Sequence, residues 1–169
     1  QMIASYLDFA RGEGGEELKT IYISSWLMEV LPSISPPRLQ IEHTIDTDLA
    51  FNIKSQAFKR AIGNILGNAA KYASKVKISA FKTSKTIRIE IEDNGSGISD
   101  EEKTLVFKPF YRSDKSRHID DTHGNVGLGL AITKEIIQGH NGDITMLDSK
   151  DLGGLLVRIN LPLASERVM

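Results

Sequence analysis

The chain has 169 residues, of which 40% are hydrophobic and 25% charged, a composition that suits one globular domain with a full core. The formal net charge of −1 excludes the strongly basic surface of a nucleic-acid or anionic-membrane binder. Cysteine is absent, which excludes disulfides and thiolate metal sites, and no apolar run approaches membrane-spanning length.

The first residues predict the end of an amphipathic helix that stops at Gly12, Gly14 and Gly15. This helix is either the last piece of a bundle or a terminal helix docked on its own domain. Because the chain opens with Gln1, we expect a fragment of a longer protein. Residues 1–15 would then end a helical bundle, and residues 16–169 would form the globular domain.

Alternating apolar and polar residues predict strands in the rest of the chain, and apolar residues at three- and four-residue steps predict helices. The first half is expected to hold a strand over 20–23, a helix capped by Ser24 or Ser25 and ended after Leu31 by Pro32, strands over 39–45 and 50–54 joined by a turn at 46–48, and a helix over 55–73. A hairpin of strands 76–80 and 87–92 follows, and then a short helix capped by Ser99 that reaches Phe107. The last elements are a helix from 127–129 to Gln138 and a closing hairpin of strands 144–147 and 155–161. This order predicts an α+β fold, a two-layer sandwich with helices on one face of a mixed, mostly antiparallel sheet.

The helix over residues 55–73 carries an unusual polar stripe of Asn64, Asn68, Lys71 and Tyr72. Asparagine is a poor helix former because its side chain competes for the backbone. An amide oxygen can bind a hard cation, an ammonium can meet phosphate, and an aromatic ring can stack. The stripe is therefore either a ligand surface or a polar seam bonded to a neighbouring loop. The small residues Ala57 and Ala61 are expected to continue the polar stripe. A solvent-facing side is expected at Lys59, Arg60 and Ala70. The core face is expected to consist of Phe58, Ile62, Ile65, Leu66, Ala69 and Ala73.

A carboxylate stands at the end of the second hairpin strand, where Asp93 precedes Gly95 and Gly97. It can accept a hydrogen bond from an exocyclic amine, which adenine presents there and guanine does not. The two glycines let the backbone approach a ligand closely. Taken alone, D-x-G-x-G also fits an ordinary turn.

Two glycines, Gly127 and Gly129, open the last long helix, so that backbone N–H groups and the positive end of the helix dipole can face phosphates. They also fit a plain loop. The polar stretch over 110–126 predicts a lid or a disordered segment. Beneath it, Phe107 is expected to pack in the core.

In this order, N-I-L-G-N-A-A-K-Y (64–72), D-N-G-S-G (93–97), F-K-P-F-Y-R (107–112) and G-L-G-L-A-I (127–132) resemble the N, G1, F and G2 boxes of bacterial sensor histidine kinases. The similarity covers about residues 20–162, and within this family the sequence most resembles the EnvZ-type osmosensors. It implies the Bergerat (GHKL) ATP-binding fold, shared with DNA gyrase B and MutL, with a long mobile ATP lid.

The resemblance also implies a role for each matching residue. At the base, it assigns Tyr72 to packing on adenine, Asp93 to the adenine amine, and Gly95 and Gly97 to the shape of that pocket. At the phosphates, it assigns Asn68 to Mg²⁺ bridging the triphosphate, Asn64 to phosphate or metal support, and Lys71 to phosphate oxygens. It assigns Arg112 to the γ-phosphate, and Gly127 and Gly129 to lining the phosphates. Ile98, Phe107, Leu128 and Leu130 complete the expected nucleotide-binding set, and Asn64, Lys71 and Arg112 are the expected catalytic residues. Family members often carry a further glycine where Asn125 stands here. Two glycines remain, which is compatible with binding and changes the expected lid hinge.

Asn64 occupies the position of the general-base glutamate of gyrase-like ATPases, and an amide is not basic near neutral pH, so we expect slow hydrolysis. None of the histidines, His43, His118, His123 and His140, lies in a phosphoacceptor motif, and each is expected to be surface or structural. The phosphoacceptor should therefore lie upstream, on the dimerisation bundle that ends near residue 15.

The expected function is transfer of the γ-phosphoryl of Mg-ATP to that histidine, for relay to a response-regulator aspartate. The domain is expected to be cytoplasmic, attached to an inner-membrane sensor through its N-terminal part. Alternatives are a nucleotide-gated interaction module and a GHKL-type protein-serine kinase. An ATPase clamp is disfavoured by Asn64.

Overall fold

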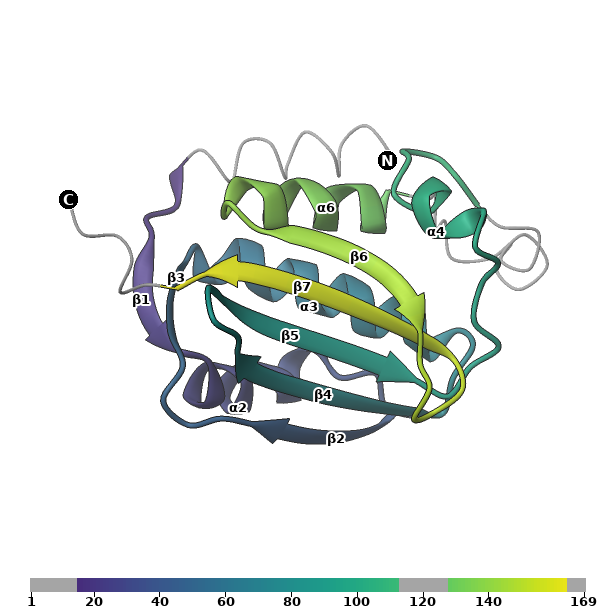
Figure 1. The fold of residues 1–169 in the computed structure, drawn as a ribbon, viewed down its shortest axis with the longest axis horizontal. Coiled ribbons are helices and arrows are strands. Elements are labelled where there is room, and N and C mark those ends of the chain that lie inside the picture. Colours follow the sequence, from purple (N-terminus) through teal and green to yellow (C-terminus); the bar gives the residue numbers. More distant parts are fainter. Residues whose placement is uncertain (1–14, 113–127, 164–169) are drawn as a thin grey trace.

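The computed structural model describes residues 15–112 and 128–163. The main sheet has five strands, and Figure 1 shows helices packed behind it. The elements are β1 (Lys19–Tyr22), α2 (Ile23–Ile34), β2 (Gln40–Ile45), β3 (Ala50–Ile53), α3 (Ser55–Ala70), β4 (Lys75–Lys82), β5 (Thr86–Asp93), α4 (Glu102–Leu105), α6 (Gly129–Gly139), β6 (Asp143–Asp148) and β7 (Leu155–Pro162). None of the described helices is long and apolar enough to cross a membrane.

The main sheet has the strand order β2-β4-β5-β7-β6, in which only β2 and β4 run parallel. Strands β1 and β3 form a separate antiparallel pair. Helices α2, α3 and α6 lie on one face of the main sheet (Figure 1). The predicted two-layer sandwich with a mixed, mostly antiparallel sheet is confirmed.

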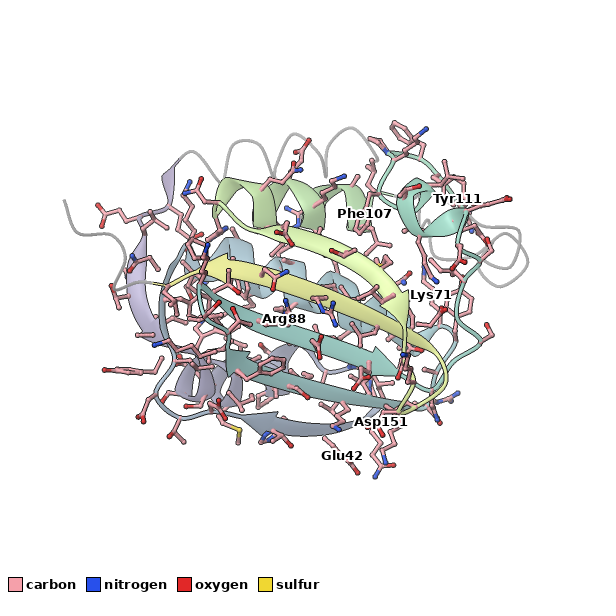
Figure 2. The ribbon with its side chains drawn as sticks, in the orientation of Figure 1. Glu42, Lys71, Arg88, Phe107, Tyr111 and Asp151 are labelled. Atoms are coloured by element: carbon pink, nitrogen blue, oxygen red, sulfur yellow. The ribbon has the colours of Figure 1, made fainter. Side chains whose placement is uncertain are left out.

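The two faces of the sheet differ in polarity because side chains alternate along each strand. In β4, Val76, Ile78 and Ala80 are buried against the helices. The outer face carries ionic side chains, such as Arg88 (Figure 2). On the same face, Arg158 Nε lies 2.7 Å from Oε2 of Glu90 on the neighbouring strand. The sheet therefore has one apolar face and one wet face, as the alternation predicts.

Helix α3 fills the middle of the core. The Phe58 ring is fully buried and makes edge contacts with Trp26, Phe51 and His140 at centroid distances of 5.4, 5.5 and 5.6 Å. This packing anchors one end of α3, and the polar stripe lies toward the other end.

The extent of α3 differs from the prediction, because the helix ends at Ala70 rather than at residue 73. Backbone bonds from Tyr72 and Ala73 to Ala69 then tighten the chain into a turn. Ala73 is consequently outside the core. Ala61, placed on the polar stripe from the sequence, is fully buried, and Ala70, placed on the wet side, packs partly against the core.

Helix α2 also departs from the prediction. It begins at Ile23, with no side-chain cap from Ser24 or Ser25, and it continues through Pro32 to Ile34. A proline in the last turn removes one backbone hydrogen bond, and buried neighbours such as Val30 hold the turn in place.

Other boundaries follow the prediction more closely. Strands β2 and β3 exist, but they belong to different sheets and do not pair. Ser99 Oγ accepts a hydrogen bond from Glu102 N at 3.3 Å and donates to Glu102 Oε1 at 3.3 Å. The N-cap of α4 is nevertheless Glu101, without a side-chain cap, and the helix ends at Leu105, short of the predicted Phe107. The predicted terminal helix over 1–11 and residues 113–126 of the predicted lid, with Asn125, His118 and His123, lie outside the described residues.

Candidate functional site

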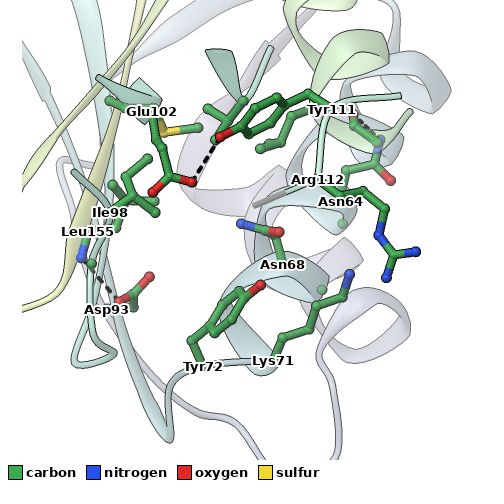
Figure 3. A pocket seen from close by; sticks show the side chains of 17 residues that line it. Asn64, Asn68, Lys71, Tyr72, Asp93, Ile98, Glu102, Tyr111, Arg112 and Leu155 are labelled. Atoms are coloured by element: carbon green, nitrogen blue, oxygen red, sulfur yellow. Dashed lines mark hydrogen bonds between the residues drawn. The ribbon is translucent and has the colours of Figure 1, made fainter. Parts of the chain in front are cut away.

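A cavity of about 260 Å³ opens at the end of α3 that carries the polar stripe. It lies between α3, the start of α6, helix α4 and the adjoining ends of β5 and β7 (Figure 3). Its lining consists of Gly63, Asn64, Gly67, Asn68, Lys71, Tyr72, Asp93, Gly97, Ile98, Glu102, Val106, Tyr111, Arg112, Gly129, Leu130, Met146 and Leu155.

The charges in the cavity are separated. In Figure 3 the Asp93 carboxylate lies on one side, whereas the Lys71 ammonium and the Arg112 guanidinium lie on the other. The Asn68 amide projects between them. Such a cavity matches a ligand with a hydrogen-bond donor at one end and negative charge at the other.

The backbone holds Asp93 in place. Its side chain is 8% exposed, and its Oδ1 accepts hydrogen bonds from Gly95 N at 2.9 Å and Leu155 N at 3.1 Å. These two bonds fix the carboxylate rotamer. The other oxygen, Oδ2, is then positioned to accept from a ligand.

Glycines allow the close packing around Asp93. A Cβ on Gly154 would lie 2.3 Å from Asp93 Oδ1, and a Cβ on Gly95 would lie 3.0 Å from the Tyr72 carbonyl oxygen. Gly97 has a φ of +69°, a conformation that favours glycine. The requirement for glycine is therefore steric at the first two positions and conformational at the third.

Asn64 joins the two helices that flank the cavity. Its Nδ2 donates to the Gly129 carbonyl oxygen at 3.1 Å and to Thr133 Oγ1 at 3.3 Å. Thr133 is fully buried and donates to the same carbonyl at 2.8 Å. Asn64 therefore fixes the first turn of α6 against α3.

Most of the predicted site residues come together in this cavity. Asn64, Asn68, Lys71, Tyr72, Asp93, Gly97, Ile98, Arg112, Gly129 and Leu130 line it. Gly95 does not line the cavity, but its N–H donates to Asp93 Oδ1. Leu128 and Phe107 are buried in the core. Phe107 thus packs as expected for a core residue, with Lys134 Nζ 5.2 Å from its ring centroid. Gly127 is outside the described residues.

Several lining residues are not predicted from the sequence. They are Gly63, Gly67, Glu102, Val106, Tyr111, Met146 and Leu155. The helical wheel of α3 could have identified Gly63 and Gly67, which flank the stripe as small residues. Met146 and Leu155 come from β6 and β7, and only tertiary pairing brings them here.

The two described histidines have the structural or surface roles that the sequence predicts. His43 is exposed on β2. His140 is 3% exposed, its Nε2 accepts a hydrogen bond from Lys54 N at 2.9 Å, and its Nδ1 lies 2.7 Å from the Ile136 carbonyl oxygen. His43 is thus a surface residue and His140 a buried structural one.

The cavity offers few direct metal ligands. Within residues 15–112 and 128–163, no group of three or more His, Cys, Asp or Glu side chains could hold a metal ion. An amide oxygen such as that of Asn68 is a suitable single ligand for Mg²⁺, which usually keeps waters and takes substrate phosphates for the rest. The donor set therefore fits Mg²⁺ that arrives with a triphosphate.

Comparison with known proteins gives a consistent result. Residues 53–165 match the model of the histidine kinase-, DNA gyrase B- and HSP90-like ATPase family. The sensor histidine kinase CpxA of Escherichia coli is 41% identical over 108 residues, which are 63% of this chain and 23% of CpxA. The chain thus matches about a quarter of that relative.

Solved structures agree with the sequence matches. The mycobacterial sensor histidine kinase MprB has a TM-score of 0.73 at 25% identity, over 88% of this chain and 99% of that one. The kinase domain of the E. coli osmosensor EnvZ has a TM-score of 0.64 at 31% identity, over 92% and 96%. From the fold, the cavity and these matches, the chain belongs to the histidine kinase-, DNA gyrase B- and HSP90-like ATPase family, and its relatives within that family are sensor histidine kinases.

Proposed function

We propose that this chain is the ATP-binding kinase domain of a two-component sensor histidine kinase. It would donate the γ-phosphoryl of Mg-ATP to a histidine on a dimerisation bundle, for relay to an aspartate of a response regulator. The observation that carries the proposal is the charge separation of the cavity, with Asp93 on one side and Lys71 and Arg112 on the other. Adenine presents an amine and the triphosphate presents negative charge, so ATP matches both ends.

At the base end, Asp93 Oδ2 accepts from the adenine amine and Tyr72 packs on the ring. Two backbone N–H groups already hold Asp93 Oδ1, so the carboxylate needs no rearrangement when the base enters. Guanine presents a carbonyl oxygen where adenine has its amine, and two acceptors would then face each other. The site therefore selects adenine nucleotides.

At the phosphate end, Lys71 and Arg112 would neutralise phosphate oxygens, and the amide oxygen of Asn68 would hold Mg²⁺. The bound ion would supply charge stabilisation to the triphosphate. The carbonyl of Gly129 is tied to Asn64, which sets the first turn of α6 beside the phosphate chain. Preorganised positive charge is the main protein contribution to phosphoryl transfer.

The reaction is an in-line displacement at the γ-phosphorus. A histidine imidazole nitrogen forms the new N–P bond as the bond from phosphorus to the β–γ bridging oxygen breaks, and ADP leaves. The Asn64 amide donates to Gly129 and Thr133 and has no basicity to activate water. Slow hydrolysis keeps the γ-phosphoryl available for the histidine.

The wider assignment follows from the same proposal. The partners would be the protein's own histidine-bearing bundle, adjoining residues 1–15, and a response regulator, with no nucleic acid. The domain would work in the cytoplasm, joined to an inner membrane only through the N-terminal part of its parent protein.

The first test is calorimetric titration of ATP, ADP and GTP with Mg²⁺ into the wild type and Asp93→Asn. An Asn Oδ1 still accepts both backbone hydrogen bonds, so the variant should fold, but its amide nitrogen would face the adenine amine. We expect adenine nucleotides to bind, GTP not to bind, and affinity to fall at least about tenfold in the variant. Asp46→Asn, in an exposed turn, is the matched control.

The second test is phosphotransfer from labelled ATP in a longer chain that restores the bundle. Acid-labile, base-stable label on the bundle supports the kinase function, and label on serine would favour a protein-serine kinase. ATP binding with no transfer would instead favour a nucleotide-gated interaction module.

A further inference from the structure

One side-chain hydrogen bond at the rim of the cavity has no part in the roles described so far. The Tyr111 hydroxyl donates to Glu102 Oε2 at 3.0 Å, and both side chains line the cavity (Figure 3). Tyr111 immediately precedes Arg112 in the chain. The bond therefore acts on the backbone that carries the guanidinium into the cavity.

The acceptor side of this bond is firmly held. Glu102 exchanges two hydrogen bonds with Ser99, which fix its backbone and its Oε1. The next residue, Lys103, contacts Asp100 and also lies 2.9 Å from Oδ1 of Asp148, at the end of β6. Through α4, the Glu102 carboxylate is thus connected to the edge of the main sheet.

The donor side depends on that support. Phe110 has a φ of +67°, a conformation that costs a non-glycine residue about 1–2 kcal/mol. Its side chain is 58% exposed, so burial does little to hold the turn. The hydrogen bonds of Tyr111 do more: its N donates to the Lys108 carbonyl oxygen at 3.2 Å, and its hydroxyl donates to Glu102.

We propose that Glu102 and Tyr111 are positioning residues for Arg112. Their hydrogen bond links the left-handed turn at Phe110 to α4 and sets the direction in which the guanidinium enters the cavity. Discrimination between ATP and ADP then depends on this bond as well as on Arg112. The inference rests on the proposed function, in which Arg112 meets the γ-phosphate.

The test is the ratio of ATP to ADP affinity, measured by calorimetry with Mg²⁺ on this chain. Tyr111→Phe removes only the hydroxyl, and Glu102→Ala removes the acceptor. We expect each to lower the ratio about three- to tenfold, with ADP affinity changed by less than about twofold. The double variant should do no more than either single one, because both remove the same bond.

Two exposed residues serve as matched controls. Tyr22→Phe changes an exposed tyrosine on β1, and Glu101→Ala changes the exposed neighbour of Glu102. Neither should alter the ratio. Partial unfolding of a variant would lower ATP and ADP affinity together and would leave the ratio unchanged, so the readout separates positioning from stability.

Arg112→Ala distinguishes this inference from the proposed function. It should lower the ratio by itself, and adding Tyr111→Phe should then have no further effect. If the wild type binds neither nucleotide, the proposed function is wrong and the inference is overturned with it. If the wild type binds both but Arg112→Ala leaves the ratio unchanged, Arg112 does not meet the γ-phosphate and the inference is overturned, while ATP binding stands. If Arg112→Ala lowers the ratio but Tyr111→Phe does not, only the positioning role is overturned.

Discussion

The side-chain amide of Asn64 donates to the carbonyl oxygen of Gly129 at 3.1 Å, which ties the middle of α3 to the first residue of α6. The seam interpretation of the polar stripe therefore holds for Asn64, and the ligand-surface interpretation stays a prediction. Asn64 is bonded to a neighbouring segment, as a structural seam requires, and it also lines the cavity. Under the proposed function, Asn64 would position the phosphate end of the cavity while it keeps these structural bonds.

Asn64→Asp should weaken both the fold and nucleotide binding. A carboxylate cannot donate, so it would face the Gly129 carbonyl oxygen with an unfavourable charge. We expect a loss of about 1–3 kcal/mol in the free energy of unfolding, together with weaker ATP binding. Urea unfolding and calorimetry measure the two effects. Asn141→Asp, at an exposed position with a φ of +61°, should change neither, and equal losses in both variants would contradict the role of Asn64.

Adjacent glycines after β6 should respond differently to alanine. Gly154→Ala places a Cβ 2.3 Å from Asp93 Oδ1 and must displace that carboxylate, so ATP affinity should fall about tenfold or more. Gly153 has a φ of +89°, and no atom of the described residues lies within 4 Å of the place that a Cβ would take. Gly153→Ala should therefore cost about 1–2 kcal/mol of stability and leave the affinity of the folded protein intact. Calorimetry and thermal unfolding on both variants separate the effects. Identical affinity losses would argue against a special contact at Gly154.

Glu16 should stabilise α3 from a distance in sequence. The helix has no capping side chain of its own, and the Glu16 carboxylate accepts from Gln56 N at 2.6 Å and Ala57 N at 3.0 Å. Glu16→Ala should therefore lower the free energy of unfolding by about 1 kcal/mol. ATP affinity should not change, because the cavity lies toward the other end of the helix. Glu17→Ala is the exposed control, and a comparable loss there would remove the capping explanation.

The ion pair between Asp100, just before α4, and Lys103 on α4 should contribute to stability over a wide pH range. A hydrogen bond from Lys103 lowers the pKa of the Asp100 carboxyl below its ordinary 3.8, and Asp100 raises the pKa of Lys103 above its ordinary 10.5. The contribution of Asp100 to the free energy of unfolding is therefore present above pH 3.8 and is lost as the pH falls through the pKa of Asp100 in the folded protein. The contribution of Lys103 is present below pH 10.5 and is lost as the pH rises through the pKa of Lys103 in the folded protein.

Urea unfolding of the wild type and Asp100→Asn at several pH values tests this behaviour. The difference between the two proteins should stay constant from about pH 5 to pH 9 and should shrink toward about pH 2. Added salt should reduce it at neutral pH, because both groups are near the surface. If the stability difference between the wild type and Asp100→Asn grew as the pH fell, the ion pair would not explain it.

Helical periodicity predicted that Asn64, Asn68, Lys71 and Tyr72 share one side of the chain, and all four line the cavity. Their spacing is visible in the sequence, although only Asn64 and Asn68 lie within α3, since Lys71 caps the helix and Tyr72 follows in a turn. The end of α3 and the path of α2 through Pro32 were not visible in this way, because packing of buried neighbours decides where a helix stops.

The contribution of β7 was hidden for a different reason. Leu155 N and Asp93 Oδ1 are separated by 62 residues, and only the pairing of β5 with β7 brings them together. No local pattern reports a backbone N–H as a partner. The glycine at position 154 is recognisable in the sequence as a turn residue, but its steric role beside Asp93 needs the tertiary structure.

The pairing of β5 with β7 also has a kinetic consequence. The segment from Asn94 to Gly153, which includes α4, α6 and β6, connects β5 to β7. Its two ends meet where Gly154 N donates a hydrogen bond to the Asp93 carbonyl oxygen at 3.0 Å. Closing so long a loop is slow relative to local steps, so this junction should form late in refolding. ATP binding during refolding would then be among the last signals to recover, after helical circular dichroism.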